Sequence, residues 1–408
     1  MNLLRRHPIG TIVLAQLFGT SLWFSPNSAA DSLAIAWGLS PAQLGELTSA
    51  TQLGFILGTL VLATTGLADR FPASRIFALS SLLGAVFNAG FALIATGVTS
   101  AMVFRFAVGL CLAGIYPLGM KMVIAWTRGA AGSTLGLLVA MLTLGSALPH
   151  AVRAAGGGLS WQGVVLTSSV LALVGGATIR WLGDGPHLPP GGRGTVAWGA
   201  ALRAFANPRF RASALGYFGH MWELYAFWTL VPFLVAEIVR GGGLPAGDAS
   251  RTTSALTFAV IGIGAAGCVL AGRLSQRFGS PRAAATALSV SGLMCLLYPL
   301  IANLGAVVCT AALLVWGLAV VADSAQFSAV SAQTCPPELI GGALAIQNSI
   351  GFLITVFAIT LVTAAYGGQG ASVTWYLLPG PVVGLLFFRR LLSGDAAAQP
   401  PGPPADRA

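Results

Sequence analysis

The stretch LADRF at residues 67–71, followed by Arg75, occurs a second time as LSQRF at residues 274–278, followed by Arg282. The two copies lie about half of the 408-residue chain apart, and each separates two long apolar runs. Repetition of a pattern at this distance is typical of membrane proteins built from two related halves. The sequence therefore predicts two units of similar architecture, each with a basic loop between two apolar segments.

Composition indicates the solvent in which the chain folds. Charged residues make up 8% of the chain and hydrophobic residues 56%, and the mean hydropathy is +0.82. A soluble domain carries about 25% charged residues. So little charge cannot cover a water-facing surface, and we therefore expect lipid to surround most of the protein.

Twelve apolar runs are long enough to cross a bilayer as α-helices, which takes about 20 residues each. Gly and Pro are too frequent, and alternation too weak, for a β-barrel. The expected fold is an all-α polytopic membrane protein with twelve transmembrane helices in two six-helix pseudo-symmetric halves. Numbered in chain order as spans 1 to 12, the runs lie at residues 9–30, 43–65, 76–96, 99–122, 131–153, 161–182, 210–236, 253–272, 283–302, 304–328, 340–365 and 371–390.

A polar, Pro- and Gly-rich stretch at residues 183–209 divides the runs six and six. It reads as a cytoplasmic linker between an N-terminal half, residues 1–182, and a C-terminal half, residues 210–392. Residues 393–408 are rich in Pro and Ala, and we expect them to form a disordered cytoplasmic tail.

The net charge of +10 would suit nucleic-acid binding, but the positions of the charges argue against it. Most Lys and Arg residues fall on one side of the predicted membrane, and only Arg153, Arg240 and Arg251 fall on the other. This positive-inside bias places both termini in the cytoplasm. The basic excess then reflects topology and attraction to anionic lipid heads. We expect a multi-pass protein of a bacterial-type inner (plasma) membrane with no nucleic-acid partner.

Two motifs resemble those of the major facilitator superfamily. Residues 65–72, TGLADRFP, are similar to the family's loop between helices 2 and 3, roughly Gly-x-Leu-Ala-Asp-Arg-x-Gly-Arg-Arg, although Thr65 and Pro72 replace its glycines. The second copy, at residues 272–279, keeps both glycines but has Gln in place of the acid. Arg105 and Gly109 resemble the helix 4 motif. The resemblance covers the whole chain and implies a secondary transporter.

The basic loops suggest a conformational latch. Asp69 can pair with a neighbouring Arg or lie at a helix N-terminus, whose dipole favours anions. Such a contact is weak and easily remade, and the family resemblance implies that it holds an outward-facing state. The alternative is that these charges only set topology. The latch residues are expected to be Asp69, Arg70, Arg75, Arg277 and Arg282.

Ionisable residues inside the spans are costly to bury unless paired or hydrated. Glu223 lies near the middle of span 7, and a carboxylate in an apolar cavity can bind a proton when enclosed and release it when wetted. The alternatives are a structural partner for Arg105, which lies in span 4, or a backbone kink. The candidate proton-coupling residues are Glu223, Asp323, His220 and His150.

Polar and aromatic residues in the spans suggest a substrate wall, because the family resemblance places spans 1, 4, 7 and 10 around a central cavity. Pro26 interrupts span 1 beside several of them. Trp and Tyr could equally belong to the membrane-interface belt. The candidate substrate-binding residues are Trp23, Asn27, Arg105, Trp222, Tyr225, Gln326, Gln347 and Asn348.

The expected function is secondary active transport of a small organic or anionic solute by alternating access, coupled to protons. Residues 145–150 faintly resemble the span 5 motif of drug/proton antiporters, but Leu148 replaces a glycine, which weakens the alternative of drug or metabolite efflux. A transporter-like membrane sensor or scaffold is an alternative of another class. The chain has no phosphate-binding loop, clustered catalytic groups or metal-ligand spacing, so we expect no enzyme activity, no cofactor and no metal. We expect a monomer.

Overall fold

The computed structural model describes residues 5–127, 131–156, 159–187, 198–336 and 339–392. These residues are almost entirely helical and include no β-strand. The predicted tail at residues 393–408 and part of the predicted linker lie outside the described residues. An all-helical architecture follows from the need to satisfy every backbone N–H and C=O within lipid.

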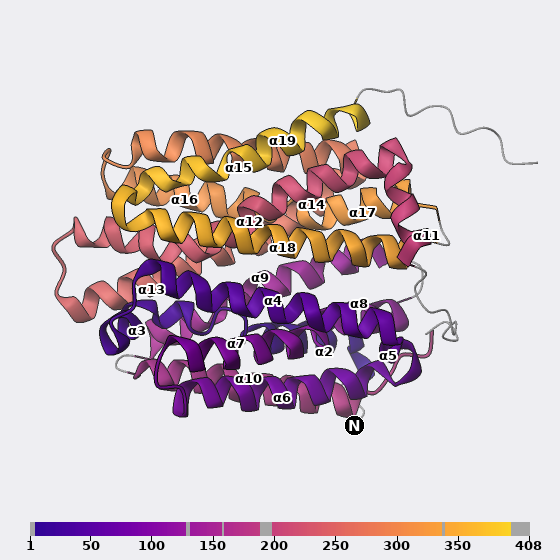
Figure 1. Ribbon diagram of the computed structural model, residues 1–408, viewed down its shortest axis with the longest axis horizontal. Helices are drawn as coiled ribbons and strands as arrows, with labels where there is room; N and C mark the ends of the chain where they lie inside the picture. Colours follow the sequence, from indigo (N-terminus) through magenta and orange to yellow (C-terminus); the bar gives the residue numbers. More distant parts are fainter. Residues whose placement is uncertain (1–4, 128–130, 157–158, 188–197, 337–338, 393–408) are drawn as a thin grey trace, which may run out of the picture.

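The first group of helices occupies the lower part of Figure 1 and is called the N-terminal half below. Its helices are α2 (Pro8–Thr20), η1 (Asn27–Ala29), α3 (Ala30–Trp37), α4 (Pro41–Thr65), α5 (Leu67–Arg70), α6 (Ala73–Leu93), α7 (Val98–Ala113), α8 (Tyr116–Trp126), α9 (Ala131–Ala155) and α10 (Trp161–Leu182).

The second group occupies the upper part of Figure 1 and is called the C-terminal half. The short helices α11 (Trp198–Arg203) and η2 (Ala204–Ala206) lead into it. Its helices are α12 (Pro208–Arg240), α13 (Ala246–Gly262), α14 (Gly264–Phe278), α15 (Ser280–Ile301), α16 (Ala306–Val320), α17 (Ser324–Thr334), α18 (Ile340–Gln369), η4 (Gly370–Leu377), α19 (Pro379–Phe388) and η5 (Arg389–Leu391).

Twelve crossings account for these helices. Ten helical stretches of the described chain are long and apolar enough to cross a membrane. The last of them contains two crossings, because the chain turns back at η4 between α18 and α19 (Figure 1). The shorter apolar helix α2 begins the first crossing. The predicted twelve-helix fold is therefore confirmed.

Glycines let equivalent helices approach closely in the two halves. A Cβ atom on Gly109 of α7 would overlap the carbonyl oxygen of Thr51 on α4. A Cβ atom on Gly317 of α16 would overlap the carbonyl oxygen of Val260 on α13. The two sites are separated by the same half-chain distance as the repeated loops. The sequence repeat therefore corresponds to a repeat of helix packing.

Four crossings are interrupted partway through the bundle; in the eighth, α13 and α14 are separated at residue 263. In the first crossing, α2 ends at Thr20 and a turn leads to η1, as Pro26 predicts. In the fourth, α7 and α8 are separated at residues 114–115, and in the tenth, α16 and α17 are separated at residues 321–323. Interrupted helices leave backbone groups without helical partners, and polar side chains meet the interruptions of the first and tenth crossings, at Arg105 and Asp323 respectively.

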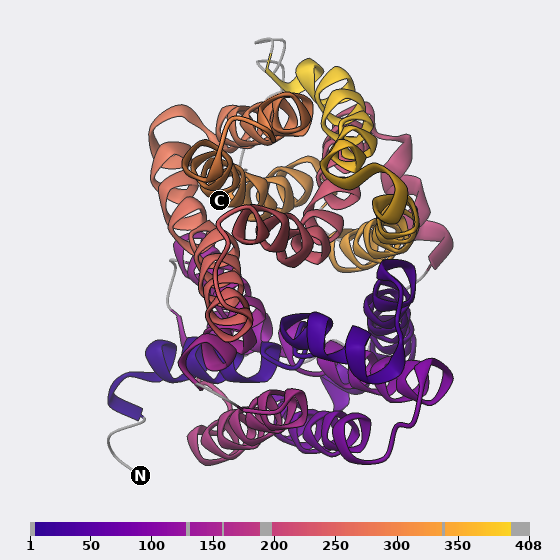
Figure 2. The ribbon, with the colours of Figure 1, turned by 90° about the vertical axis from the view of Figure 1, so that its left-hand side faces the viewer.

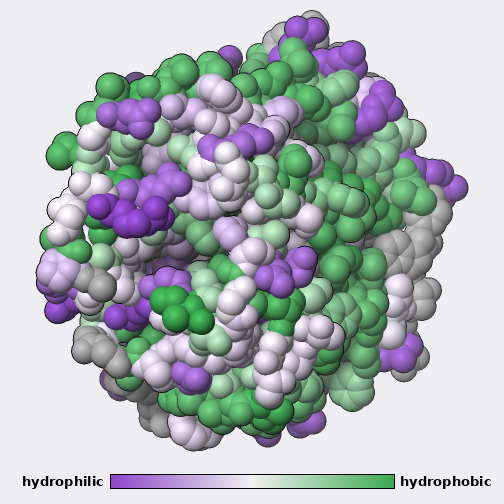
Figure 3. Space-filling view, turned by 60° about the vertical axis from the view of Figure 1, so that its left-hand side comes forward, coloured by the Kyte–Doolittle hydropathy of each residue, from purple (hydrophilic) through white to green (hydrophobic). Residues whose placement is uncertain are grey.

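The two halves meet along two pairs of helices. Helix α4 packs against α18, and α9 packs against α13 and α14. The end-on view of Figure 2 shows the two groups of helices on either side of this contact. Apolar side chains cover the flank of the bundle in Figure 3, as expected for a surface in contact with lipid.

Candidate functional site: a cavity between the halves

A cavity of about 540 Å³ lies between the halves, at the end of the molecule opposite the N-terminus. Side chains of α3 and α4 line it from one half, and the end of α12 and the start of α13 line it from the other. Figure 3 shows this end hollowed and bordered by hydrophilic side chains. Asp31 and Arg240 are the charged residues of its lining.

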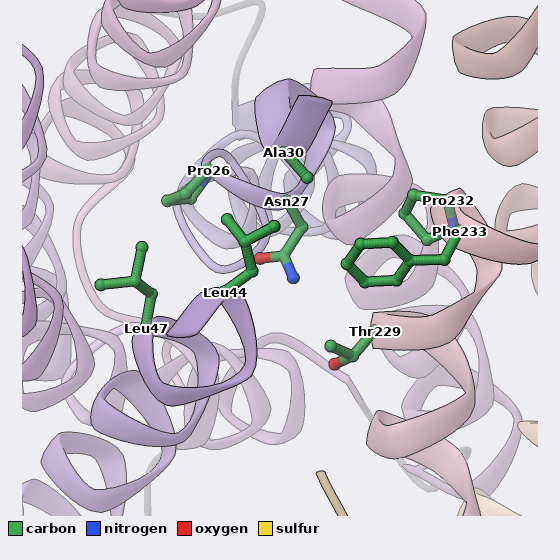
Figure 4. A pocket seen from close by; sticks show the side chains of 8 residues that line it. All are labelled: Pro26, Asn27, Ala30, Leu44, Leu47, Thr229, Pro232 and Phe233. Atoms are coloured by element: carbon green, nitrogen blue, oxygen red, sulfur yellow. The ribbon is translucent and has the colours of Figure 1, made fainter. Parts of the chain in front are cut away.

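A smaller pocket lies against the first, and both are lined by Asn27 and Phe233. In Figure 4, Asn27 of η1 and Phe233 of α12 face each other across this pocket. The amide of Asn27 donates to Oγ1 of Thr48 at 2.9 Å. Among the candidate substrate-binding residues, Asn27 therefore lies at the cavity.

Six aromatic residues from both halves pack together on the inner side of this pocket. Trp23 stacks on Tyr225 with ring centroids 5.6 Å apart, and it also contacts Phe55 and Phe352. Phe24 and Trp228 complete the cluster. All six are buried. Trp23 and Tyr225, two candidate substrate-binding residues, thus contact each other across the two halves.

Arg105 lies inside the N-terminal half and is 1% exposed. Its guanidinium donates to Oγ1 of Thr51 at 3.1 Å and to Oδ1 of Asn88 at 3.0 Å. It also donates to the carbonyls of Leu22 and Trp23, at 3.0 and 2.6 Å, where the first crossing is interrupted. The described residues include no carboxylate partner for Arg105. It therefore holds the broken helix in place through neutral acceptors.

Glu223 lies inside the C-terminal half, away from Arg105. Its carboxylate accepts from the indole of Trp316 at 2.6 Å, the hydroxyl of Ser291 at 2.9 Å and the thiol of Cys295 at 3.4 Å. These residues come from α15 and α16, so Glu223 points into the six-helix bundle. It does not line the cavity between the halves.

His220 and Asp323 form a buried pair in the same half. Nδ1 of His220 lies 2.8 Å from Oδ1 of Asp323, at the interruption of the tenth crossing. Although these atoms are close, none of the side-chain nitrogens and oxygens of the two residues has a partner in hydrogen-bond geometry among the described residues. The structure brings these two candidate coupling residues together, one turn of α12 from Glu223.

Asp69 pairs with Lys121 of α8, with Nζ 2.8 Å from Oδ1. Lys121 also donates to the carbonyl of Ala68. Both partners belong to the N-terminal half, and no ion pair joins the two halves within the described ranges. The other candidate latch residues, Arg70, Arg75, Arg277 and Arg282, are exposed.

The remaining candidates lie at different places. The indole of Trp222 donates to the carbonyl of Tyr376 at 2.8 Å within the C-terminal half, and Trp222 does not line the cavity. Gln326 and Gln347 are buried in α17 and α18, and Asn348 is exposed. His150 of α9 is buried and lines the cavity.

Two polar contacts at the ends of the bundle escaped the sequence analysis. Arg153 pairs with Asp31 at 2.7 Å and donates to Ser250 of the other half at 3.2 Å. The backbone N–H of Ser74, at the start of α6, donates to Asp184 at 2.8 Å. Arg153 could have indicated the first contact, because it is one of the few basic residues predicted to lie on the outer side of the membrane.

A twelve-helix bundle with a cavity between two repeated halves is typical of membrane transporters, and comparison with known proteins identifies the family. The sequence model of the Major Facilitator Superfamily matches residues 12–394. The chain belongs to the Major Facilitator Superfamily.

Two curated relatives match parts of the chain. The niacin transporter NiaP of Acinetobacter baylyi is 37% identical over 87 residues, which is 21% of this chain and 19% of the relative. The 3-(3-hydroxy-phenyl)propionate transporter of Escherichia coli is 30% identical over 220 residues, 51% of this chain and 49% of the relative. The matched parts thus span about half or less of these relatives.

Solved structures share the fold. The xylose transporter XylE of E. coli, in a partially occluded inward-open conformation, aligns with a TM-score of 0.72 at 14% identity, covering 96% of this chain and 99% of that one. A bacterial homologue of the human lysosomal transporter Spinster aligns with a TM-score of 0.69 at 17% identity, covering 96% of each chain.

Proposed function

We propose that this protein carries a small organic acid, together with protons, by alternating access between its two halves. The observation that carries the proposal is the cavity between the halves, which ends at an aromatic cluster built from both. Movement of one half against the other would separate Trp23 from Tyr225 and open the path at the opposite end. The closed cluster and the hollow end then correspond to one state of the transport cycle.

Charge at the cavity favours an organic anion. Asp31 is neutralised by Arg153, which leaves Arg240 as the cation of the lining without an ion-pair partner among the described residues. The remaining lining is largely apolar. Two relatives are named as transporters of niacin and of 3-(3-hydroxy-phenyl)propionate, and both compounds are small aromatic carboxylic acids. An aromatic monocarboxylate is the class that fits these features together.

The buried ionisable groups of the C-terminal half support proton coupling. His220 and Asp323 lie 2.8 Å apart in an enclosed site, and a base beside an acid can share one proton. Opening of this site to water would make release of the proton easier. Glu223 lies close by and completes the proposed coupling group with its neutral donors. His150 lies at the cavity instead and is treated separately below.

The proposed orientation places both termini and the linker at residues 183–209 in the cytoplasm of a bacterial inner membrane. This orientation is supported by the basic residues, most of which lie at the same end of the bundle as the N-terminus. Single cysteines introduced into the linker and into the loop at residues 241–245 should react with impermeant thiol reagents from opposite sides of the membrane. Labelling of the linker from the periplasmic side would invert the assignment.

A ligand screen tests the substrate class. Protein purified in detergent is heated with nicotinate, 3-phenylpropionate, benzoate and their amides, and with sugars and nucleosides as neutral comparisons. A ligand that binds the native state raises the unfolding temperature by mass action. We expect stabilisation by one or more of the acids and none by the matching amides. Stabilisation by a sugar or nucleoside alone would contradict the proposal.

A further inference from the structure

His150 and Thr257 bring two buried hydrogen-bonding atoms to the cavity, one from each half. His150 lies on α9 and is 1% exposed, and Thr257 lies on α13 and is fully buried. Both line the cavity. Nε2 of His150 and Oγ1 of Thr257 have no hydrogen-bond partner among the described residues. Because buried polar atoms are nearly always hydrogen-bonded, we expect each of these two atoms to bind a partner that the described residues do not supply.

Thr257 differs in this respect from other buried threonines of the C-terminal half. Thr229 donates to the carbonyl of Tyr225 at 2.7 Å, and Thr355 donates to that of Phe352 at 2.7 Å. These hydroxyls are satisfied within their own helices, as is usual for Thr in an apolar helix. The hydroxyl of Thr257 has no such bond, and Thr257 lines the cavity, so a ligand that moved in between the halves could supply the missing partner.

The charges around the cavity favour an anionic ligand. Asp31 is held by Arg153, whose nitrogen lies 2.7 Å from its carboxylate. Glu237, one turn before Arg240, accepts from Tyr366 at 2.6 Å and does not line the cavity. Arg240 is exposed at the mouth. An anion entering the cavity would therefore meet a cation first and neutral donors further in.

We propose that His150 and Thr257 form the subsite that binds the carboxylate of the transported acid; this inference rests on the function proposed above. The Nε2–H tautomer of His150 and the hydroxyl of Thr257 each donate to a carboxylate oxygen. The apolar part of the ligand packs against Leu44, Pro232 and Phe233. Because the donors come from different halves, the bound carboxylate also joins the halves. His150 is then a substrate-binding residue rather than a proton carrier.

The test measures the dissociation constants of nicotinate and 3-phenylpropionate by calorimetry on the full-length protein in detergent. Thr257→Val keeps the shape of the side chain and removes its hydroxyl, and His150→Phe removes the nitrogen. A hydrogen bond to a charged group is lost in each, so we expect affinity to fall roughly tenfold or more. Thr355→Val, at an equally buried threonine away from the cavity, should bind as the parent does.

Each result decides between the two proposals. If the parent binds an acid and both cavity variants bind it equally well, the subsite is wrong and the substrate class stands. If the parent binds none of the acids, both are wrong. A measurement that needs no substrate compares modification of Thr257→Cys and Thr355→Cys by an anionic methanethiosulfonate reagent, because both positions are fully buried and only Thr257 lines the cavity. We expect Thr257→Cys to react faster, and equal rates would overturn the subsite.

Discussion

His220 and Asp323 face each other at 2.8 Å inside the C-terminal half, where the tenth crossing is interrupted. Both side chains are at most 1% exposed, and each has an atom without a hydrogen bond in the described part of the chain. A buried acid beside a base can hold a single proton at little electrostatic cost, whereas loss of that proton leaves a net charge in the interior. This arrangement suits a group that changes protonation as the protein opens and closes.

Replacement of Glu223 by Gln tests the coupling group. The amide imitates a permanently protonated carboxyl, so Glu223→Gln should lose accumulation driven by a pH gradient while retaining substrate exchange. Exchange needs no net proton movement, which separates coupling from binding. Uptake and counterflow in reconstituted vesicles measure the two properties.

Ser291→Ala is the matched control, because it removes one donor to Glu223 and keeps the carboxylate. It should still accumulate substrate. Undiminished accumulation by Glu223→Gln would assign coupling to Asp323 and His220, and Asp323→Asn should then show the loss.

Neutralisation of Asp69 tests the latch. Asp69→Asn should slow transport strongly and leave insertion and folding intact, because the exposed pair with Lys121 contributes only about 0–1 kcal/mol to stability. Lys121→Gln should have a similar effect if the pair is the functional unit. Transport rates and unfolding temperatures of the single and double variants form a cycle that isolates the pair. If Asp69→Asn transported substrate as fast as the parent protein, the latch would be wrong and the charge of Asp69 would serve only to set the topology.

Loss of Arg105 should destabilise the N-terminal half. Arg105→Ala removes four hydrogen bonds, two of them to the carbonyls of Leu22 and Trp23, and leaves Leu22 with only the hydroxyl of Ser25 as a side-chain donor, so we expect a cost of roughly 3 kcal/mol or more. Arg105→Lys should restore little of the lost stability, since an ammonium lacks the planar fork that reaches these acceptors. Unfolding temperatures of both variants in detergent provide the measurement. Parental stability of Arg105→Ala would show that the broken helix needs no such clamp.

Close helix packing gives an independent test of the fold. Gly109→Ala should prevent normal packing of α7 on α4, because the added Cβ overlaps the carbonyl of Thr51. Gly136→Ala is the matched control, since a Cβ on Gly136 meets no atom within 4 Å. We expect a marked loss of folded yield for Gly109→Ala and none for Gly136→Ala, measured by size-exclusion chromatography in detergent. Equal yields would contradict the helix contact.

The architecture was predictable because its signals are local. Apolar runs of bilayer length and a repeated loop define twelve crossings and two halves without knowledge of any side-chain contact. The interruption of the first crossing was predictable for the same reason, from Pro26 alone. The domain boundaries drawn through residues 183–209 stay a prediction, since ten of those residues lie outside the described chain.

The directions of the polar side chains were not predictable. Glu223 and Tyr225 are two residues apart, and two residues turn an α-helix by about 200°. Glu223 consequently points into the C-terminal half, whereas Tyr225 meets Trp23 of the other half. From sequence, Glu223 was assigned to proton coupling and Tyr225 to the substrate wall, but the direction of neither side chain could be predicted, because rotation of α12 is set by tertiary packing. Thr257 carried no signal at all, since its missing hydrogen bond exists only in the folded protein.

The most direct test of alternating-access, proton-coupled transport is uptake of labelled nicotinate and 3-phenylpropionate by vesicles containing the purified protein, with and without an imposed pH gradient. We predict accumulation of one of these acids above its external concentration, abolished by a protonophore and absent from empty vesicles. Exchange without a gradient should persist. Passive equilibration that is indifferent to the pH gradient, or no uptake of any acid, would contradict this mechanism.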